Sequence, residues 1–278
     1  VSKYLGRAFR QRTAQDVLEE LREVNSRYVF FIDDNLLGHS SQSRKRARDI
    51  FRGMIHLNLK KRWWMQTSVD SVEDFETIKL AGRSGCMFAF IGFEAIDVAS
   101  LKRMKKGINL RIGVDKYRRA IDALHAQGIG VVGAFIIGND HESPKYYKKL
   151  AEFIVRSGID VVQIAILTPL PGTELMDRMV EEGRLLYDRF PDDWDKFRLS
   201  YVVHKTEGLD VSMIYTGNNY IKRHIYRFHI LIYRALRSLV AIKNPVNTYA
   251  VYRFNKALKK SWMGSHYFRN DSSTFRCF

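Results

Sequence analysis

The sequence predicts an α/β fold, in the form of a partial (β/α) barrel of parallel strands followed by a basic, mostly helical extension. Over about the first 190 residues, five short apolar runs alternate with amphipathic helical segments, which is the pattern of a parallel sheet. The runs are continuously apolar, as expected of strands that are buried on both faces. Each run ends in polar residues, and ligands of such folds bind at the carboxyl ends of the strands.

The predicted elements follow one another in a regular order. Thr13 is placed to cap an opening helix, which has no strand of its own before it and whose apolar stripe ends at Val24. The strands are expected at residues 28–32, 63–65, 87–91, 131–137 and 161–167. A basic helix is expected over residues 40–59, then a helix with Val72, Phe75 and Ile78 inward, then helices that stop at Gly128, at Gly158 and near Glu182.

The pattern changes after about residue 190, and we expect a barrel unit over residues 1–195 and an extension over residues 196–278. The extension is expected to be helical from Asp210 to Val240, interrupted at Pro245, and helical again around residues 249–260. The net charge is +16, and residues 211–278 hold twelve Lys and Arg against one acidic residue, Asp271. A nearly balanced body with a basic, aromatic extension is typical of a domain with a surface-binding appendage.

Cysteine usage excludes several classes of protein. The chain has two cysteines, Cys86 and Cys277, which rules out a disulfide framework and any zinc or iron–sulfur site ligated by its own cysteines alone. Such usage fits a reducing compartment, so we expect a cytoplasmic protein. Cys86 is expected to act as a small buried hydrophobe, and no apolar run approaches the ~18 residues of a membrane span.

Each group of polar residues at a strand end has two interpretations. Asp33-Asp34-Asn35 follows the first strand and serves either as a helix N-cap or as a set of ligands. Glu94 follows the third strand and either pairs with a nearby Lys or Arg or belongs to a site. The segment Asp140–Pro144 indicates a surface turn more than a metal or acid–base pair.

Five stretches form an ordered set of motifs, four of them at strand ends. They are Gly6–Arg10, Phe30–Asn35, Ile91–Glu94, Phe135–Asp140 and Leu167–Thr173. In this order they resemble the radical S-adenosylmethionine (SAM) enzymes, and within them the group that carries an N-terminal cobalamin-binding domain. The resemblance covers residues 1–205.

The sequence departs from that family in one respect. The family holds a four-iron, four-sulfide cluster with three cysteines, spaced C-x3-C-x2-C after the first strand, and this sequence has neither the strand nor the cysteines. The resemblance favours truncation just after the cluster-binding motif, because the match is intact from the first residue. This fragment alone is then expected to bind no cluster and to cleave no SAM.

The resemblance implies the cofactors and the reaction. The cofactors are SAM, a 4Fe–4S cluster whose ligands lie outside this chain, and cobalamin on a preceding domain. One electron, from a donor such as flavodoxin or ferredoxin, cleaves SAM to a 5′-deoxyadenosyl radical. The radical serves methyl transfer to, or modification of, an unreactive carbon. The part of the protein is to orient the reactants and to exclude water, and no catalytic residue is assigned.

The resemblance also implies a set of cofactor-binding residues at or near the strand ends: Asp33, Asp34, Asn35, Gln66, Ser68, Glu94, Gly133, Ile136, Gly138, Gln163, Thr168 and Pro169. The first three would hold the methionyl amine, and the next three the carboxylate, the amine and the ribose hydroxyls. The two glycines would let the backbone approach the adenine, with the isoleucine against its face. The last three would complete the far side.

Two other functions remain open on the sequence. One is a self-contained (β/α) enzyme with a divalent metal held by Asp33, Asp34 and Glu94, with His141 as a further candidate. The other is a non-catalytic module that binds a membrane or a partner. Sequence upstream of Val1 would discriminate them, since a C-x3-C-x2-C motif there favours the radical enzyme.

The basic extension favours a peripheral membrane contact or a partner domain over nucleic acid, because apolar residues lie between the basic ones. Five basic residues are expected to face an anionic membrane: Lys222, Arg223, Arg227, Arg234 and Arg237. Such a contact suits a lipid-like substrate as well as a small molecule. The same apolar face would equally suit packing on the barrel.

Overall fold

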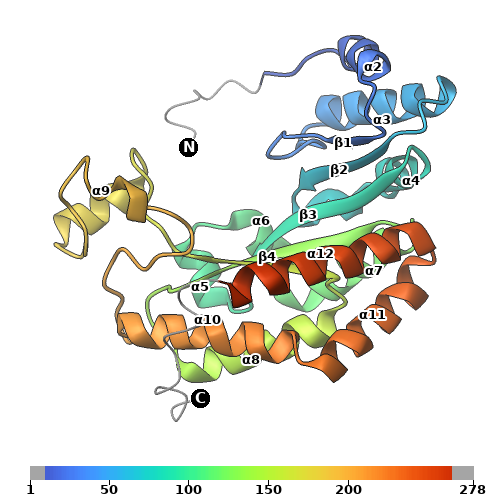
Figure 1. The fold of residues 1–278 in the computed structure, drawn as a ribbon. Helices are drawn as coiled ribbons and strands as arrows, with labels where there is room; N and C mark the ends of the chain where they lie inside the picture. The colour runs from blue at the N-terminus through green and yellow to red at the C-terminus, as the bar shows by residue number, and fades with distance from the viewer. Residues whose placement is uncertain (1–9, 265–278) are drawn as a thin grey trace.

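The computed structural model describes residues 10–264, and its centre is a five-stranded sheet in which every neighbouring pair of strands is parallel. The strands are β1 (Tyr28–Phe30), β2 (Arg62–Thr67), β3 (Cys86–Glu94), β4 (Gly130–Ile137) and β5 (Val161–Ile166). They lie side by side in sequence order, and the sheet curls into half a barrel (Figure 1). The predicted partial (β/α) barrel is therefore confirmed.

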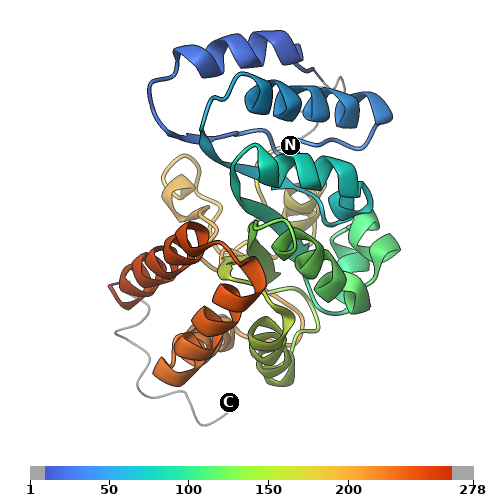
Figure 2. The same cartoon turned by 90° about the vertical axis from the view of Figure 1, so that its right-hand side faces the viewer.

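Five helices cover the convex face of the sheet: α2 (Ala14–Glu23), α3 (Ser41–His56), α4 (Phe75–Arg83), α7 (Tyr117–His125) and α8 (Pro144–Ser157). Their buried residues share one core with strand residues such as Trp63, Ile91 and Phe135. Thr13 and Ser40 begin α2 and α3, because their hydroxyl oxygens accept a backbone N–H of the first turn. These two helices lie at one end of the molecule (Figure 2).

The opposite, concave face of the sheet carries two rows of side chains, since residues paired across parallel strands point to the same side. One row is Gln66, Phe90, Val132 and Val161. The next row, nearer the carboxyl ends of the strands, is Gly92, Ala134 and Gln163. Two residues predicted for the site, Gln66 and Gln163, therefore share this face.

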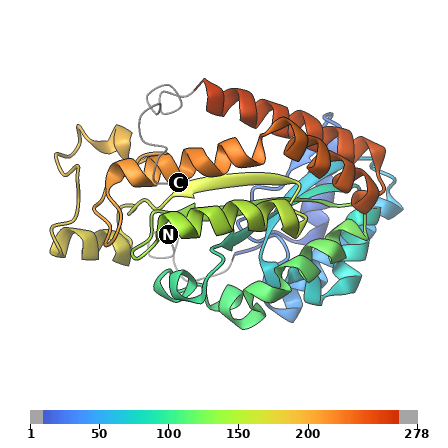
Figure 3. The same ribbon diagram turned by 90° about the horizontal axis from the view of Figure 1, so that it is seen from below.

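Helix α12 (Pro245–Met263) fills the concave face near the amino ends of the strands. Its Phe254 packs against Trp64 of β2, with ring centroids 5.2 Å apart, and its Val251 joins a cluster with Phe88 and Val161. Helix α10 (Val211–Ile225) runs beside α8, and α11 (Phe228–Ile242) leads into α12 (Figure 3). The amino end of the half-barrel is thus closed from within, and the carboxyl end is left open.

Asp160, just before β5, fastens the last helices to the barrel. Its carboxylate lies 2.8 Å from the Nε2 of His125 on α7 and accepts a hydrogen bond from the hydroxyl of Ser238 on α11. Its backbone carbonyl accepts from Arg234 Nη2 and from Asn255 Nδ2, each at 2.9 Å. All five residues are buried, so this network fixes α11 and α12 to the amino end of the sheet.

Two predictions near the start of the sheet were wrong. The first strand ends at Phe30 rather than residue 32, and it is not buried, since Tyr28, Phe30 and Ile32 are 63%, 50% and 80% exposed. The reason is that, among residues 10–264, β1 is an edge strand paired with β2 alone. Phe75 does not point inward, because α4 begins at this residue and turns its side chain to solvent.

The connections after β3, α10 and α11 also differ from the predicted ones. Two short helices, α5 (Val98–Arg103) and α6 (Gly107–Ile112), precede α7 and carry no long apolar stripe that would predict them. The break after α10 lies at Tyr226-Arg227, and Pro245 begins α12 instead of interrupting a helix. Proline fits a first turn because its missing N–H has no partner there in any case.

Two of the five basic residues that were expected to face a membrane do not face outward. Arg234 is 2% exposed and bound to Asp160, and Lys222 is largely buried, so neither faces outward. Within residues 10–264, no helix combines the length and apolar character needed to cross a bilayer. Cys277 and residues 6–9 of the first motif lie outside the described residues.

Candidate functional site

The carboxyl ends of β1 and β2 are joined by Asn35. Its Nδ2 donates to the Ser68 hydroxyl at 3.3 Å, and its Oδ1 accepts from the Thr67 hydroxyl at 3.3 Å and from the Gly38 N–H at 3.2 Å. The structure thus brings Asn35 and Ser68 together at one edge of the sheet. Asp33 and Asp34, in the same loop, are exposed.

Asp70 lies at the centre of this polar region and was not predicted as a site residue. It is 4% exposed, accepts a hydrogen bond from the Ser68 hydroxyl, and lies 3.1 Å from Arg111 Nη2. His39 Nδ1 and Arg44 Nη2 are 3.6 and 3.9 Å away. Asp70 follows β2 in the short helix η1 (Val69–Glu73), and its place three residues after the strand was the one signal available.

Glu94 ends β3 in a conformation that few residues other than glycine adopt. Its φ is +68°, and the pairing of β3 with β4 shifts between Gly92 and Glu94, so the strand bulges here. The bulge folds the Glu94 carboxylate back over Gly92, where an added Cβ would lie 2.5 Å from Glu94 Oε1. Non-glycine residues held at positive φ are concentrated at functional sites.

A buried pair of side chains holds this bulge in place. Asn109 Nδ2 donates to the carbonyls of Gly92 and Phe93 at 2.9 and 3.1 Å, and the Tyr117 hydroxyl donates to Phe93 O at 3.0 Å. Burial raises the pKa of Tyr117 to about 12, so it remains a donor at neutral pH. Asn109, on the unpredicted helix α6, therefore positions Glu94 through the backbone.

In this structure the Glu94 carboxylate is paired, as one of its two interpretations anticipated. Lys106 Nζ lies 2.7 Å from Glu94 Oε1, and Lys106 is about one-third exposed while Glu94 is 14% exposed. The carboxylate is thus accessible enough to exchange one cationic partner for another. A cationic or amine-bearing ligand at this edge of the sheet would compete with Lys106 for Glu94.

The residues predicted on β4 and β5 lie in two different environments. Ile136 and Gln163 are partly or fully exposed on the side of the sheet that carries Gln66. Gly133 is buried on the convex side, where an added Cβ would lie 2.9 Å from Ile159 Cδ1. Packing against the helices accounts for that glycine.

The turn after β4 and the loop after β5 are held by hydrogen bonds to backbone groups. Gly138 has a φ of +83° and donates its N–H to Glu142 Oε2 at 2.8 Å. Glu142 is 5% exposed, so the turn is anchored by a buried carboxylate, whose pKa burial raises. The Thr168 hydroxyl donates to Ile166 O at 3.0 Å, and Pro169 beside it is buried.

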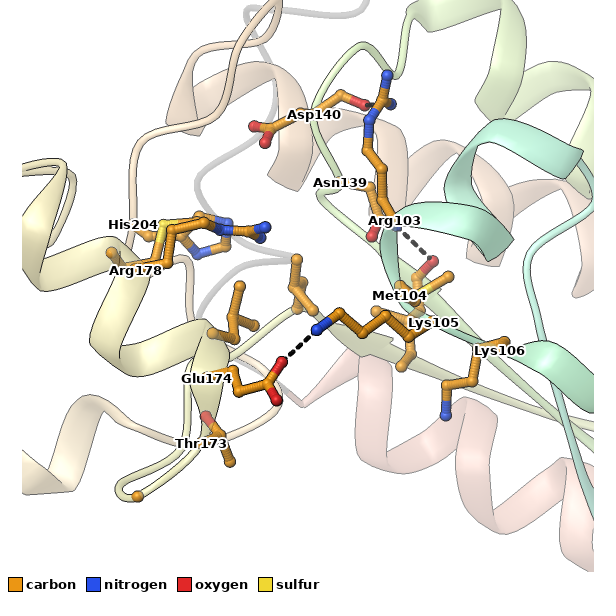
Figure 4. A pocket seen from close by; sticks show the side chains of 15 residues that line it. Arg103, Met104, Lys105, Lys106, Asn139, Asp140, Thr173, Glu174, Arg178 and His204 are labelled. Carbon is orange, nitrogen blue, oxygen red and sulfur yellow. Dashed lines mark hydrogen bonds and ion pairs between the residues drawn. The ribbon is translucent and has the colours of Figure 1, made fainter.

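A cavity of about 520 Å³ opens beside these ends of β4 and β5 (Figure 4). Its walls are the segment between α5 and α6, the turn after β4, and α9 (Glu174–Glu181). Glu174 and Lys105 form an ion pair from opposite walls. The lining residues are Arg103, Met104, Lys105, Lys106, Ile136, Asn139, Asp140, Leu167, Gly172, Thr173, Glu174, Leu175, Arg178, Met179 and His204.

His204 is an uncharged residue in the wall of this cavity. It is 1% exposed, and its Nδ1 has no hydrogen-bond partner among residues 10–264. Burial, assisted by the positive charge of Arg184, lowers the pKa of His204 to about 4. Asp140 forms an ion pair with Arg184 at the same edge, and His141 beside it is exposed, which matches the predicted surface turn.

The alternative metal site gains no support from the arrangement of the acidic residues. Asp33, Asp34 and Glu94 do not gather, and the described part of the chain holds no group of three or more His, Cys, Asp or Glu side chains close enough for an ion. Cys86 lies at the amino end of β3, where burial raises the pKa of its thiol. Its place in the core matches the predicted small hydrophobe and suits no cluster at the carboxyl edge.

Comparisons with known proteins give relatives and structural neighbours, although no family model matches. The chain is 30% identical over 228 residues to bacteriochlorophyllide d C-12(1)-methyltransferase of Chlorobaculum tepidum, covering 80% of this chain and 47% of the relative. It is also 30% identical over 191 residues to hopanoid C-2 methylase of Rhodopseudomonas palustris, covering 66% and 35%. The chain thus spans less than half the length of these relatives.

Two solved structures share the fold of this chain. The apo form of OxsB, a cobalamin-dependent SAM radical enzyme, matches 91% of this chain and 42% of its own, with a TM-score of 0.62 and 16% identity. The fold is that of the radical SAM enzymes. TsrM of Kitasatospora setae, a radical SAM methyltransferase solved with cobalamin and a [4Fe-4S] cluster, matches 62% of this chain and 34% of its own, with a TM-score of 0.55 and 17% identity.

These findings confirm the predicted resemblance to radical SAM enzymes of the cobalamin-dependent group. The carboxyl edge of the half-barrel in this chain has two zones. Asn35, Ser68 and Glu94 form a polar zone after β1 to β3, and the cavity with Ile136 lies after β4 and β5. Lys106 touches both, since it pairs with Glu94 and lines the cavity.

Proposed function

We propose that this chain is the SAM-binding half-barrel of a radical SAM methyltransferase that acts on an unreactive carbon. The observation that carries the proposal is the Glu94 bulge at the open end of a half-barrel whose relatives are methyltransferases. SAM, a 4Fe–4S cluster and cobalamin, when bound, would supply the one-electron chemistry and the methyl group for transfer. The cluster ligands are expected outside this chain.

The residues of this chain would bind and orient SAM. Glu94 offers a carboxylate to a cationic group of SAM, and this contact requires release of Lys106. Asn35 and Ser68 offer an amide and a hydroxyl at the neighbouring strand ends, where the methionyl end would lie. Helix α12 fills the concave face near the amino ends of the strands and so excludes water from that end of the half-barrel.

Substitution of Glu94 tests this proposal. In the complete protein, reconstituted anaerobically, Glu94→Gln should weaken SAM binding about tenfold or more, since a charged hydrogen bond is lost. Glu76→Gln is the matched control, because Glu76 is an exposed carboxylate that pairs with Arg52 on the outer helices. Equal SAM dissociation constants for the parent and Glu94→Gln would remove Glu94 from the site.

The partners we propose are a small-molecule or lipid-like substrate and a flavodoxin or ferredoxin as electron donor. The positive charge of the chain, +16, supports attraction of an acidic donor surface. We also propose a peripheral membrane contact through the outward face of α11. Phe228, Leu236 and Val240 of this helix are 78%, 58% and 71% exposed, while its Arg234 and Ser238 are buried.

A further inference from the structure

We propose that the cavity between β5, α10 and α12 binds the carboxylate of an apolar substrate, with the ammonium group of Lys222 as its counterion. This inference rests on the proposed function, because it names the substrate class of the same half-barrel. The cavity has a volume of about 260 Å³ and lies along β5, which is an edge strand among residues 10–264. Of the residues predicted to bind SAM, Gln163 alone lines it, so this cavity is distinct from the one beside α9.

Lys222 brings a positive charge into this cavity, and the described part of the chain supplies no counterion for it. The side chain is largely buried, and no carboxylate or carbonyl oxygen of residues 10–264 pairs with its Nζ. No acidic residue is among the described residues that line the cavity, and residues 211–264, which form two of its walls, contain none. Burial lowers the pKa of the Lys222 ammonium to about 8. An anion in the cavity would offset the cost of keeping this cation away from water.

A second group in the cavity lacks a hydrogen-bond partner. Asn218 lies one turn before Lys222 on the same face of α10, and both residues line the cavity. The Oδ1 of Asn218 is buried and accepts no hydrogen bond within residues 10–264. A ligand that carries a hydroxyl or N–H group next to its carboxylate would satisfy Asn218 and Lys222 together.

The charge of the cavity fits a carboxylate better than a phosphate. Lys222 is the single cation among the described lining residues, and Gln163 and Ser200 add neutral hydrogen-bonding side chains. A phosphate group carries about two negative charges and is met by several donors, whereas a carboxylate carries one. One ammonium group therefore matches one carboxylate.

The other walls are apolar and aromatic. Ile225 of α10 and Leu258 of α12 line the cavity together with Tyr226 and Trp262. The rings of Tyr226 and Trp262 stack with their centroids 6.1 Å apart. Trp262 Nε1 donates to Asn219 Oδ1 at 3.1 Å, so the indole is fixed in the wall. An apolar or aromatic body beside the carboxylate would fit these walls.

The size and position of the cavity suit an anchor for one end of the substrate. A volume of about 260 Å³ is below the range of most small-molecule sites, about 300–1,000 Å³, so the rest of the molecule would extend beyond it. Gln163 shares a row on the concave face with Ala134 and Gly92, and Gly92 lies two residues before Glu94. Helix α12 fills this face toward the amino ends of the strands. The substrate would therefore extend toward the carboxyl ends, where the reaction would occur.

Protection of Lys222 from acetylation tests the proposal in the complete protein. Acetic anhydride reacts with uncharged amines, and mass spectrometry of the digested protein measures the reaction at each lysine. The probe is mandelate, which has a carboxylate, a neighbouring hydroxyl and a phenyl ring, and its neutral counterpart is mandelamide. Saturating mandelate should slow acetylation of Lys222 at pH 8 about fivefold, as a rise of its pKa from about 8 to about 9 would produce. Mandelamide should leave the rate nearly unchanged, and so should either probe at Lys116, an exposed lysine outside the cavity.

Variants locate the binding by equilibrium dialysis. The parent should bind mandelate about tenfold more tightly than mandelamide, as a charged hydrogen bond provides. Lys222→Gln should abolish this preference. Asn218→Asp should abolish it also, because the new carboxylate supplies Lys222 with a counterion inside the protein. Lys256→Gln, which removes an exposed lysine of α12 outside the cavity, is the matched control and should keep the preference.

Three results would overturn the proposal. The first is that mandelate protects Lys222 no better than mandelamide does. The second is protection by inorganic phosphate as strong as that by mandelate, which would show an adventitious ion only. The third is displacement of mandelate by SAM, which would assign Lys222 to the cofactor. Unchanged SAM affinity of Glu94→Gln would contradict the proposed function and leave the results with mandelate unaltered, so the two proposals fail separately.

Discussion

His204 is a buried histidine, and the pH dependence of stability reports its environment directly. Burial lowers its pKa from 6.5 to about 4, so the unfolded chain binds a proton that the folded chain refuses between these values. The stability that depends on His204 is therefore fully present above pH 6.5 and is lost as the pH falls toward 4. Asp140 and Arg184 lie close to it and their charges oppose each other in this shift.

We predict that the free energy of unfolding of His204→Gln falls less steeply with decreasing pH than that of the parent. For a shift of this size, the parent should lose about 2 kcal/mol of unfolding free energy between pH 7.5 and pH 5 through this residue. Glutamine does not titrate, so the unfolding free energy of the variant should fall by about 2 kcal/mol less over the same pH range. Urea unfolding at both pH values measures the difference, with His39→Gln as the control for an exposed histidine. Parallel profiles for parent and variant would contradict the assigned burial.

At the level of elements, the end of β3 is a bulge that three separate segments build together. Gly92 provides the space, Asn109 of α6 and Tyr117 of α7 hold the carbonyls, and Glu94 accepts the positive φ. The contacts of Asn109 and Tyr117 are not local in sequence, which is why the motif Ile91–Glu94 identified the position but not its geometry. The bulge re-aims one carboxylate toward the open end of the barrel.

We predict that Gly92→Ala separates SAM binding from stability. The new methyl group would lie 2.5 Å from Glu94 Oε1, so the carboxylate must move, yet it is the flexible end of a side chain and the fold should tolerate the change. SAM affinity of the complete protein should fall about tenfold, while the melting temperature changes little. Gly107→Ala is the matched control, since nothing lies within 4 Å of its added Cβ. Unchanged SAM affinity with Gly92→Ala would argue against a role for the bulge.

The sequence predicted the elements of the sheet well because apolar runs and their polar ends are local signals. Asn35, Gln66, Ser68 and Glu94 were predicted from their places at or just after the strand ends and stay predicted cofactor contacts, and Asp70 was not predicted because it lies one turn further on. Asn109 could not be found this way, because it stands on α6 and no spacing in the chain connects it with the end of β3.

At the scale of the molecule, the C-terminal helices have two roles that the sequence did not separate. Helix α12 is part of the half-barrel, since it packs on its concave face, and Asp160 binds α11 and α12 to the sheet. The division of the chain at residue 195 stays a prediction. Helix α11 turns Arg234 and Ser238 inward, while five of its large apolar residues are exposed: Phe228, Ile232, Leu236, Leu239 and Val240. An ordinary surface helix has the opposite arrangement.

The exposed apolar face of α11 and the positive charge around it lead to the last prediction. Residues 211–264 contain ten Lys and Arg and no acidic residue, so we expect the surface around α11 to attract anionic lipid. The complete protein should co-sediment with anionic vesicles more than with neutral ones, and binding should weaken between low and physiological salt. Each basic residue near the lipid surface contributes about 1 kcal/mol, and the apolar face adds to this.

The double variant Leu236→Asp with Val240→Asp should reduce this binding at least about tenfold, because it places two carboxylates on the apolar face. Val98→Asp is the matched control, since Val98 is 54% exposed on α5, away from α11. Binding that ignores lipid charge, or that the double variant leaves intact, would refute the membrane contact. In that case the outward face of α11 would have to meet another protein surface, and the loss of an oligomer or a domain contact in the same variant would show it.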